Sequence, residues 1–281
     1  MIGQPAIEAL LSSHLTGKIR YGERVVSISE DSKEVSVTTD KGRVVTAKYA
    51  IGADGARSTI RQALSIPFTG TKPNMVWAVM DVFIETDFPQ CPEIITFELD
   101  GKSRVSWIPR ERGLARFYVM LDDGGEVTLE RALASLKEHL APHKIGFREV
   151  EWYSTFDVKE RIAASFFSSG GRVVLAGDAA HVHSVNGGQG LNTGIADAFA
   201  LAWRLALVLR NEQLDVGKAR DVLGSYDLER RTIAEDVIDV AAKLVRATAQ
   251  DAKGYVSTIE KKAGYITGES GYITPNLCVK H

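Results

Sequence analysis

Asp178 is the residue of this sequence best placed to bind a ligand. It follows a short apolar run, 173–176, that predicts a strand buried on both faces, and it is separated from that run only by Gly177. A carboxylate at the carboxyl end of such a strand can accept hydrogen bonds from neighbouring hydroxyls, as a ribose or ribityl chain presents them. The alternative interpretation is an aspartate that caps an ordinary turn.

A glycine-rich bend and a helix follow Asp178. Glycines at 187, 188 and 190 lack Cβ atoms, so the backbone there can approach a ligand closely. From Leu191 the apolar residues fall at helical spacing, and the first N–H groups of a helix favour a phosphate or an anionic ring. Each residue alone fits a plain strand–loop–helix connection. The strand, acidic turn, glycine-rich bend and helix in this order predict a binding site for a polyanionic or polyhydroxylated ligand.

A second acidic turn lies at Asp54 and Gly55. It ends a strand-like run and leads into a short predicted helix through Arg61 and Leu64. Glycine at this position permits a tight turn close to a phosphate. Without a ligand, the same residues form an Asp-Gly turn before a capped helix.

The two motifs together resemble a known family. The runs Ala-Gly-Asp-Ala-Ala-His-Val-His-Ser and Gly-Gln-Gly-Leu-Asn-Thr-Gly resemble the second flavin-binding motif of the FAD-dependent aromatic hydroxylases, which share the para-hydroxybenzoate hydroxylase fold. The phenol 2-monooxygenase branch is the most similar. The resemblance implies that Asp178 binds the ribityl hydroxyls of FAD. It also implies that the backbone of five further residues approaches the pyrophosphate and the isoalloxazine. These residues are Gly188, Gln189, Gly190, Leu191 and Asn192.

The Asp-Gly turn resembles a further motif of the same family. That motif lies close to the pyrophosphate and is linked to binding of both FAD and the reduced pyridine nucleotide, so Asp54 and Gly55 are expected beside the phosphates. Gln4 matches a glutamine that contacts flavin in relatives. The cofactors implied are FAD and, as co-substrate, NAD(P)H.

The segment 108–118 resembles the hairpin of phenol hydroxylase that faces both substrate and flavin. By motif match, Arg110 and Tyr118 are the expected catalytic residues that face the substrate, and Arg116 faces the flavin. A tyrosine hydroxyl can hydrogen-bond a phenolate, and an arginine can favour the ionised phenol. The alternative interpretation gives two solvated hairpin arginines and a half-buried strand tyrosine.

No metal site is expected. His181 and His183 alternate along an extended segment and suggest a metal pair, but a third ligand at suitable spacing is missing, so they are interpreted as polar loop residues near a ligand. Cys91 and Cys278 lie far apart, outside any Cys-x-x-Cys pattern, and are interpreted as free thiols of a reducing compartment.

The composition gives information about which partners the protein could bind. The 281 residues are 44% hydrophobic and 25% charged, with a formal net charge of −2, which is ordinary for a globular protein and gives no reason to expect nucleic acid or an anionic membrane. No apolar run approaches the ~20 residues that span a bilayer, and no signal peptide is evident. The expected partners are a small aromatic substrate and, as an open option, a second copy in a homodimer. The expected location is the cytoplasm.

The expected fold class mixes α+β and α/β. Predicted elements include a helix at Pro5–Leu15, a β-meander before Asp54, four strands between Met75 and Leu121, and a helix at Thr128–Leu140. The resemblance implies an incomplete FAD-binding domain of Rossmann-like, para-hydroxybenzoate hydroxylase type over 1–70 and 159–281, with C-terminal helices. It also implies a substrate-binding antiparallel sheet domain over 71–158.

Two parts of a full family member are absent from the sequence. Relatives begin with a βαβ unit carrying Gly-x-Gly-x-x-Gly for the ADP half of FAD, and the phenol hydroxylase branch continues into a thioredoxin-like C-terminal domain. The function implied is therefore that of a truncated FAD-dependent monooxygenase, which hydroxylates a phenolic or aromatic substrate with NAD(P)H and O₂. The alternatives are a non-catalytic remnant or binding protein of this fold, and a flavin epoxidase or halogenase.

Overall fold

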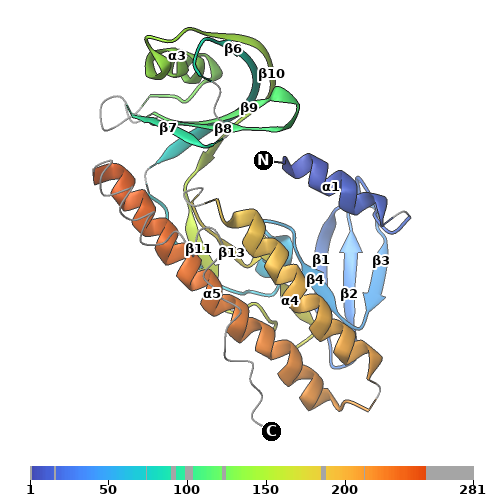
Figure 1. Ribbon diagram of the computed structural model, residues 1–281. Coiled ribbons are helices and arrows are strands. Elements are labelled where there is room, and N and C mark those ends of the chain that lie inside the picture. Colours follow the sequence, from blue (N-terminus) through green and yellow to red (C-terminus); the bar gives the residue numbers. More distant parts are fainter. Residues whose placement is uncertain are drawn as a thin grey trace. The chain divides into compact units, whose positions relative to one another are not determined.

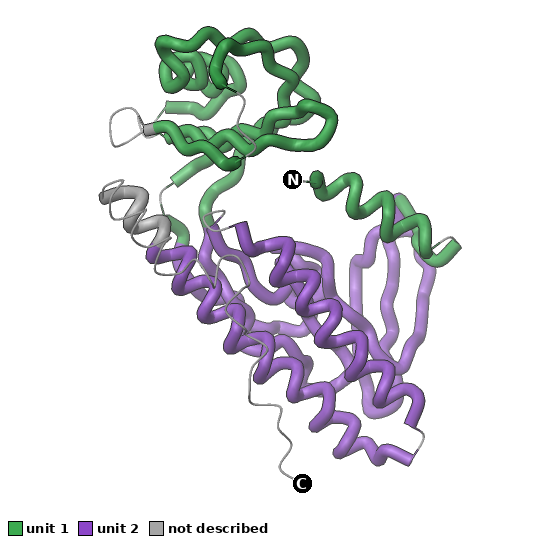
Figure 2. Tube along the Cα trace, in the orientation of Figure 1, with its two compact units in different colours: residues 1–21, 72–158, 249–252 green, residues 22–71, 159–248, 253–281 purple. Residues whose placement is uncertain are grey.

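Two compact units make up the chain in the computed structural model (Figures 1 and 2). Unit 1 comprises 1–21, 72–158 and 249–252, and unit 2 comprises 22–71, 159–248 and 253–281. The structure describes residues 2–15, 17–73, 75–89, 93–98, 104–121, 125–184, 188–211 and 213–250, with side chains in the last helix described as far as 243. The expected mixture of helices and sheets is confirmed.

Unit 1 is built on a five-stranded antiparallel sheet. Its strand order is β10-β6-β9-β8-β7, and helix α3 packs on one face (Figure 1). Alternate residues of the central strands, among them Met80 and Phe117, point into the core against α3, where they pack with Leu136 of the helix; all three residues are fully buried. The elements are α1 (Gln4–Ser13), β6 (Val76–Thr86), β7 (Ile95–Glu98), β8 (Arg104–Pro109), η1 (Glu111–Gly113), β9 (Ala115–Met120), α3 (Leu129–Leu140) and β10 (Ile145–Asp157).

Unit 2 contains three small sheets. The predicted β-meander is present as β1-β2-β3, and β4 pairs in parallel with β12. A third sheet, β13-β11-β5, has strands of two to four residues that were not predicted, because such short segments show no measurable alternation. The strands are β1 (Val25–Glu30), β2 (Val35–Thr39), β3 (Val44–Ala47), β4 (Ala50–Gly52), β5 (Phe68–Thr71), β11 (Glu160–Ala163), β12 (Val173–Leu175) and β13 (His181–Val182).

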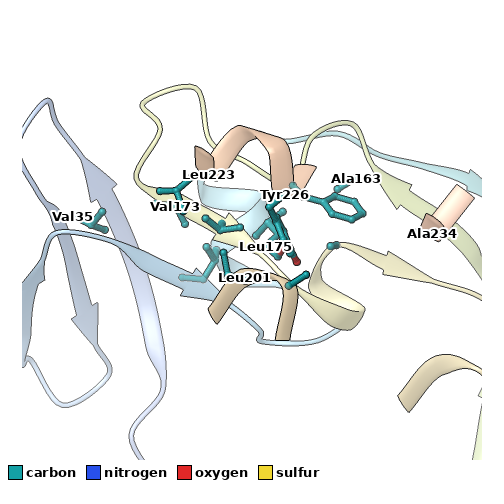
Figure 3. Close-up of a cluster of buried hydrophobic side chains, with 13 residues drawn as sticks. Val35, Ala163, Val173, Leu175, Leu201, Leu223, Tyr226 and Ala234 are labelled. Carbon is teal, nitrogen blue, oxygen red and sulfur yellow. The ribbon is translucent and has the colours of Figure 1, made fainter. Parts of the chain in front are cut away.

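Helices α2 (Thr59–Ala63), α4 (Gly190–Arg210) and α5 (Val216–Gln250) complete unit 2 together with the short η2 (Gly177–Ala179). The core lies where β12 meets the two long helices. Figure 3 shows Leu175 of β12, Leu201 of α4 and Tyr226 of α5 gathered there, and the Tyr226 hydroxyl donates to the carbonyl of Leu175 at 3.0 Å. This packing fixes the carboxyl end of β12, where the candidate site begins.

Helix α4 turns its polar face inward. Its buried residues include Thr193, Asp197 and Arg204, whereas Phe199 is 78% exposed on the apolar face. By length and composition alone, α4 could cross a membrane. Only 28% of this segment is buried, and on its inward face Asp197 and Arg204 make ion pairs inside unit 2.

Candidate functional site

The two predicted flavin motifs meet at the carboxyl ends of neighbouring parallel strands. Gly52 of β4 lies opposite Leu175 of β12, and the Ala176 N–H donates to the Gly52 carbonyl at 3.0 Å. Arg61 of α2 reaches across and donates from Nη1 to the carbonyl of Ala179 at 2.7 Å. Ligands of open α/β sheets bind at such strand ends.

Asp178 keeps its side chain available there. It lies in η2, is exposed, and makes no hydrogen bond or ion pair to any residue that the structure describes. Gly177 before it has φ +59°, a left-handed conformation that favours glycine. An unpartnered carboxylate on a well-held turn can accept hydrogen bonds from a polyhydroxylated ligand.

A buried network that the sequence analysis missed holds this turn. Asp197 of α4 has 0% exposure and accepts from the Gly177 N–H at 3.0 Å, from His181 Nε2 at 2.8 Å and from Arg230 Nε at 2.7 Å. Burial disfavours the charged carboxylate, but the hydrogen bond and charge of His181 and the charge of Arg230 outweigh it and lower the pKa of Asp197. The available signal was a charged residue on the face of α4 that also carries Thr193 and Arg204.

Asp54 uses its carboxylate within the protein. It accepts from the Ser58 hydroxyl at 2.5 Å and from the Ile60 N–H at 3.1 Å, and Ser58 in turn caps α2 by accepting from the Arg61 N–H at 2.9 Å. This is the capped helix of the alternative interpretation. Gly55 has φ +81°, with no other group within 4 Å of the position of a Cβ, so its backbone is open to a ligand.

The start of α4 is also open. Gly188 has φ +64° and no group within 4 Å of an added Cβ, and the N-cap residue Gln189 makes no side-chain capping bond. Leu191 and Asn192 are exposed in the first turn, and Gly187 lies outside the described residues. Bare backbone beside Gly190, the positive end of a 21-residue helix and the free Asp178 carboxylate fit the anionic and hydroxylated parts of FAD.

A cationic pocket of about 420 Å³ opens beside the Asp54 turn. Arg61 in its wall is 4% exposed, lies 3.8 Å from the Phe68 ring centre, and has its pKa lowered by burial and by the charge of Arg161. The Nε of Arg161 is buried and has no hydrogen-bond partner among the described residues. Such a pocket suits an anion. Its charged lining residues are Arg57, Arg61, Lys159 and Arg161.

In unit 1, Arg110, which is predicted to face the substrate, and Arg116, which is predicted to face the flavin, share one buried carboxylate. Asp81 of β6 is 6% exposed and pairs across the sheet with Arg116, which donates from Nε at 2.8 Å and from Nη2 at 2.7 Å. Arg110 approaches the same carboxylate from Nη1 at 3.3 Å. The hydrogen bond to Asp81 raises the pKa of Arg116, with a further contribution from Tyr118. Neither arginine is solvated, unlike the alternative interpretation, because the two side chains are 5% and 18% exposed.

The hairpin also brings Arg110 to the start of α1. The guanidinium packs so closely on Gly3 that a Cβ there would meet Nη2 at 1.8 Å, and Gln4 follows directly as an exposed residue. Glu111 accepts from Arg110 Nε at 3.0 Å and from Nη2 at 2.9 Å, which lowers the pKa of Glu111 to about 2. Tyr118 lies on the same face of β9 as Arg116 and packs edge-on against a phenylalanine of β10.

The two histidines serve different purposes. His181 is buried in the Asp197 network, and burial lowers the pKa of His183, whose Nδ1 lies 2.8 Å from the Ser184 carbonyl. No group of three or more potential metal ligands occurs within the described ranges.

Known proteins match this chain over most of its length. Residues 1–241 match the FAD binding domain family. The chain is 33% identical to 3-hydroxybenzoate 4-monooxygenase of Comamonas testosteroni over 298 residues, which cover 92% of this chain and 46% of that enzyme. It is 34% identical to phenol 2-monooxygenase fsqG of Aspergillus fumigatus over 211 residues, which cover 72% of this chain and 35% of that enzyme. The structure of OxyS anhydrotetracycline hydroxylase from Streptomyces rimosus superimposes on this chain with a TM-score of 0.71 and 31% identity. The match covers 94% of this chain and 52% of the hydroxylase chain.

The chain therefore belongs to the FAD binding domain family, among relatives that are aromatic monooxygenases, and the predicted family is confirmed. It spans about half or less of the length of these relatives.

Proposed function

We propose that this chain is part of an FAD-dependent monooxygenase that hydroxylates a phenolic or other aromatic substrate with NAD(P)H and O₂. The observation that carries the proposal is the unpartnered Asp178 carboxylate beside the open start of α4. When bound, FAD would supply the redox chemistry that accepts electrons from the nicotinamide and activates oxygen. Relatives named as aromatic or phenol monooxygenases support this assignment.

Residues of unit 2 would bind the flavin. Asp178 would accept hydrogen bonds from the ribityl hydroxyls, and the first N–H groups of α4 would face the anionic part of the cofactor. Because its carboxylate already caps α2, Asp54 would contribute its turn and Gly55 would contribute open backbone. The remaining predicted contacts within unit 2 are Gly188, Gln189, Gly190, Leu191 and Asn192, whereas the predicted contact Gln4 lies in unit 1.

The cationic pocket would receive a phosphate of NAD(P)H. Its four cationic side chains line one cavity, and the buried Nε of Arg161 still needs an acceptor. We expect Arg57→Ala to weaken NADPH binding by ~10-fold, more at low than at high salt, because the contact is electrostatic. Arg210→Ala, which removes an exposed charge at the end of α4, is the control. Equal NADPH affinity in both variants would place the nucleotide elsewhere.

Substrate contact is assigned to the expected sheet domain, residues 71–158, of which 72–158 belong to unit 1. Tyr118 would hydrogen-bond the phenolic oxygen, and Arg116, which also interacts with Tyr118, would face the flavin. Arg110 would act more indirectly, since Asp81 and Glu111 already occupy its guanidinium. Its contribution would be to hold Arg116, the hairpin and the start of α1 in position.

FAD titration tests the proposal. Purified chain should quench FAD fluorescence, and Asp178→Ala should weaken binding by ~10-fold or more, the effect of losing a hydrogen bond to a charged group. Asp221→Ala, which removes an exposed carboxylate from α5, should bind FAD normally. Equal affinity of the wild type and Asp178→Ala would remove Asp178 from the flavin site.

A non-catalytic binding protein of the same fold is the second candidate. The two candidates differ in turnover. An active monooxygenase consumes NADPH and O₂ faster when a phenol is added, whereas a binding protein retains FAD and consumes neither.

Location and assembly follow from the same proposal. We expect a cytoplasmic protein without a membrane partner, because α4 buries charged residues in the core of unit 2. A homodimer is the one assembly proposed. Sedimentation of the chain with and without FAD would show whether a second copy binds.

A further inference from the structure

Asp197 joins three elements around one backbone amide. It lies on α4, its partner His181 on β13 and its partner Arg230 on α5, and the amide belongs to Gly177 at the start of η2. The three residues are 0%, 2% and 6% exposed. A buried carboxylate is stable only when donors surround it, and here both of its oxygens are used.

The protons of the network follow from the donor set. An ionised carboxylate only accepts, so His181 Nε2 carries the hydrogen that faces Asp197. His181 Nδ1 has no partner among the described residues, and the His181 ring stacks on the Phe166 ring with centroids 5.6 Å apart.

The network ends at the turn that carries Asp178. The backbone of α4 approaches this turn closely, since a Cβ on Gly177 would lie 3.9 Å from the Cα of Gly194. On the other side of Asp178, Arg61 holds the Ala179 carbonyl at 2.7 Å. The side chain of Asp178 has no partner among the described residues, so these backbone attachments are what fix the position from which it projects.

We propose that Asp197 is a positioning residue that acts through Gly177 and His181 to aim the Asp178 carboxylate at the flavin. This inference rests on the proposed flavin site. It assigns a role in ligand binding to a residue that cannot touch the ligand itself, because Asp197 is fully buried.

FAD affinity of Asp197→Asn is the principal test. The amide cannot accept from all three donors, so FAD should bind ~10- to 100-fold more weakly. Glu229→Gln is the matched control: it removes the carboxylate that lies 2.6 Å from buried Arg204, between the same two helices, without touching the turn. If Glu229→Gln loses as much FAD affinity at a similar loss of stability, Asp197 has only a structural role and the proposal is overturned.

A double-mutant cycle tests whether Asp197 acts through Asp178. If it does, Asp178→Ala with Asp197→Asn should bind FAD within ~2-fold of Asp178→Ala alone, because the two changes remove the same interaction. Fully additive losses would overturn the proposal.

Amide hydrogen exchange separates this inference from the flavin assignment. In Asp197→Asn, exchange at Gly177 should accelerate while exchange in unit 1 stays unchanged. If the wild-type chain fails to bind FAD, the flavin assignment fails, and this readout still decides whether Asp197 holds the turn. Unaltered exchange at Gly177 would overturn the positioning role.

Discussion

The η2 turn of unit 2 and the β6–β9 face of unit 1 both gather predicted site residues, but they treat the charges of those residues in opposite ways. Asp178 projects from its turn without a partner among the described residues, and its support comes from groups that hold the backbone. Arg110 and Arg116 are instead tied directly to Asp81 through their guanidinium groups. One region offers a full charge to a ligand, whereas the other offers a charge that is already balanced.

The comparison indicates what each region can recognise. A free carboxylate gains its hydrogen bonds only when ligand hydroxyls arrive, so changing it should affect binding more than stability. A balanced pair of arginines contributes to the fold before any ligand binds, and a phenolate near it meets directed N–H groups rather than two full positive charges. Stability and affinity should therefore respond to different substitutions in the two units.

Asp81→Asn should give the largest change in stability. It leaves two arginines, 5% and 18% exposed, facing a neutral amide, and breaking a buried pair in this way costs about 3–5 kcal/mol. The free energy of unfolding in urea measures it. Glu151→Gln breaks the exposed Arg112–Glu151 pair of the same unit and should cost less than about 1 kcal/mol. Similar costs for the two variants would contradict the contrast between the units.

Gly3→Ala should give the next largest change in stability. The new Cβ would meet Arg110 Nη2 at 1.8 Å, so the guanidinium must leave its position between Asp81 and Glu111, at a cost of about 1–3 kcal/mol. Gly146→Ala in β10 meets nothing closer than 3.8 Å and serves as the control in thermal melts. An unchanged Tm for Gly3→Ala would show that Arg110 does not depend on this close contact.

Asp54→Ala and Asp178→Ala should separate stability from affinity within unit 2. Asp54 supports the cap of α2, so its loss should cost about 1 kcal/mol of stability. Asp178 is exposed and unpartnered, so Asp178→Ala should change stability by no more than about 0.5 kcal/mol. FAD affinity should rank the two variants in the reverse order, as fluorescence titration of both would show.

Glu111→Gln should give the smallest change in stability, and that change should depend on pH. Arg110 lowers the pKa of Glu111 from 4.5 to about 2, so the folded state binds this proton less readily than the unfolded state. The stabilisation is complete above pH 4.5 and is lost as the pH falls towards 2. Because the side chain is 30% exposed, less than about 1 kcal/mol is expected. The difference in unfolding free energy between wild type and Glu111→Gln should vanish in acid; a constant difference would exclude this ion pair as its cause.

Most helices and strands could be predicted from the sequence, because their hydrophobic periodicity is a local property of the chain. The helix at Gln4–Ser13, the sheet of unit 1 and the helix beginning at Gly190 all follow apolar spacing. The contact between the Asp54 and Asp178 motifs could not be derived from spacing, since it depends on the parallel pairing of β4 with β12. The resemblance to a family indicated a common ligand, and the structure shows that the two turns lie together.

The network around Asp197 could not be predicted from periodicity. In α4 the apolar residues that suggest a packing face are exposed, with Ile195 at 49% and Phe199 at 78%, while Asp197 and Arg204 lie inside. Local pattern alone does not reveal which face of a helix is buried when charged residues find partners in distant elements. His181 and Arg230, the partners of Asp197, are such distant residues.

The long-range hydrogen bonds of the η2 turn also constrain how the chain acquires its native state during synthesis. Arg61 reaches this turn across 118 positions, and Arg230 reaches Asp197 across 33. Contacts of such separation require loop closure and form late. A nascent chain on the ribosome would complete the meander early but could not finish this turn until Arg230 had emerged from the exit tunnel.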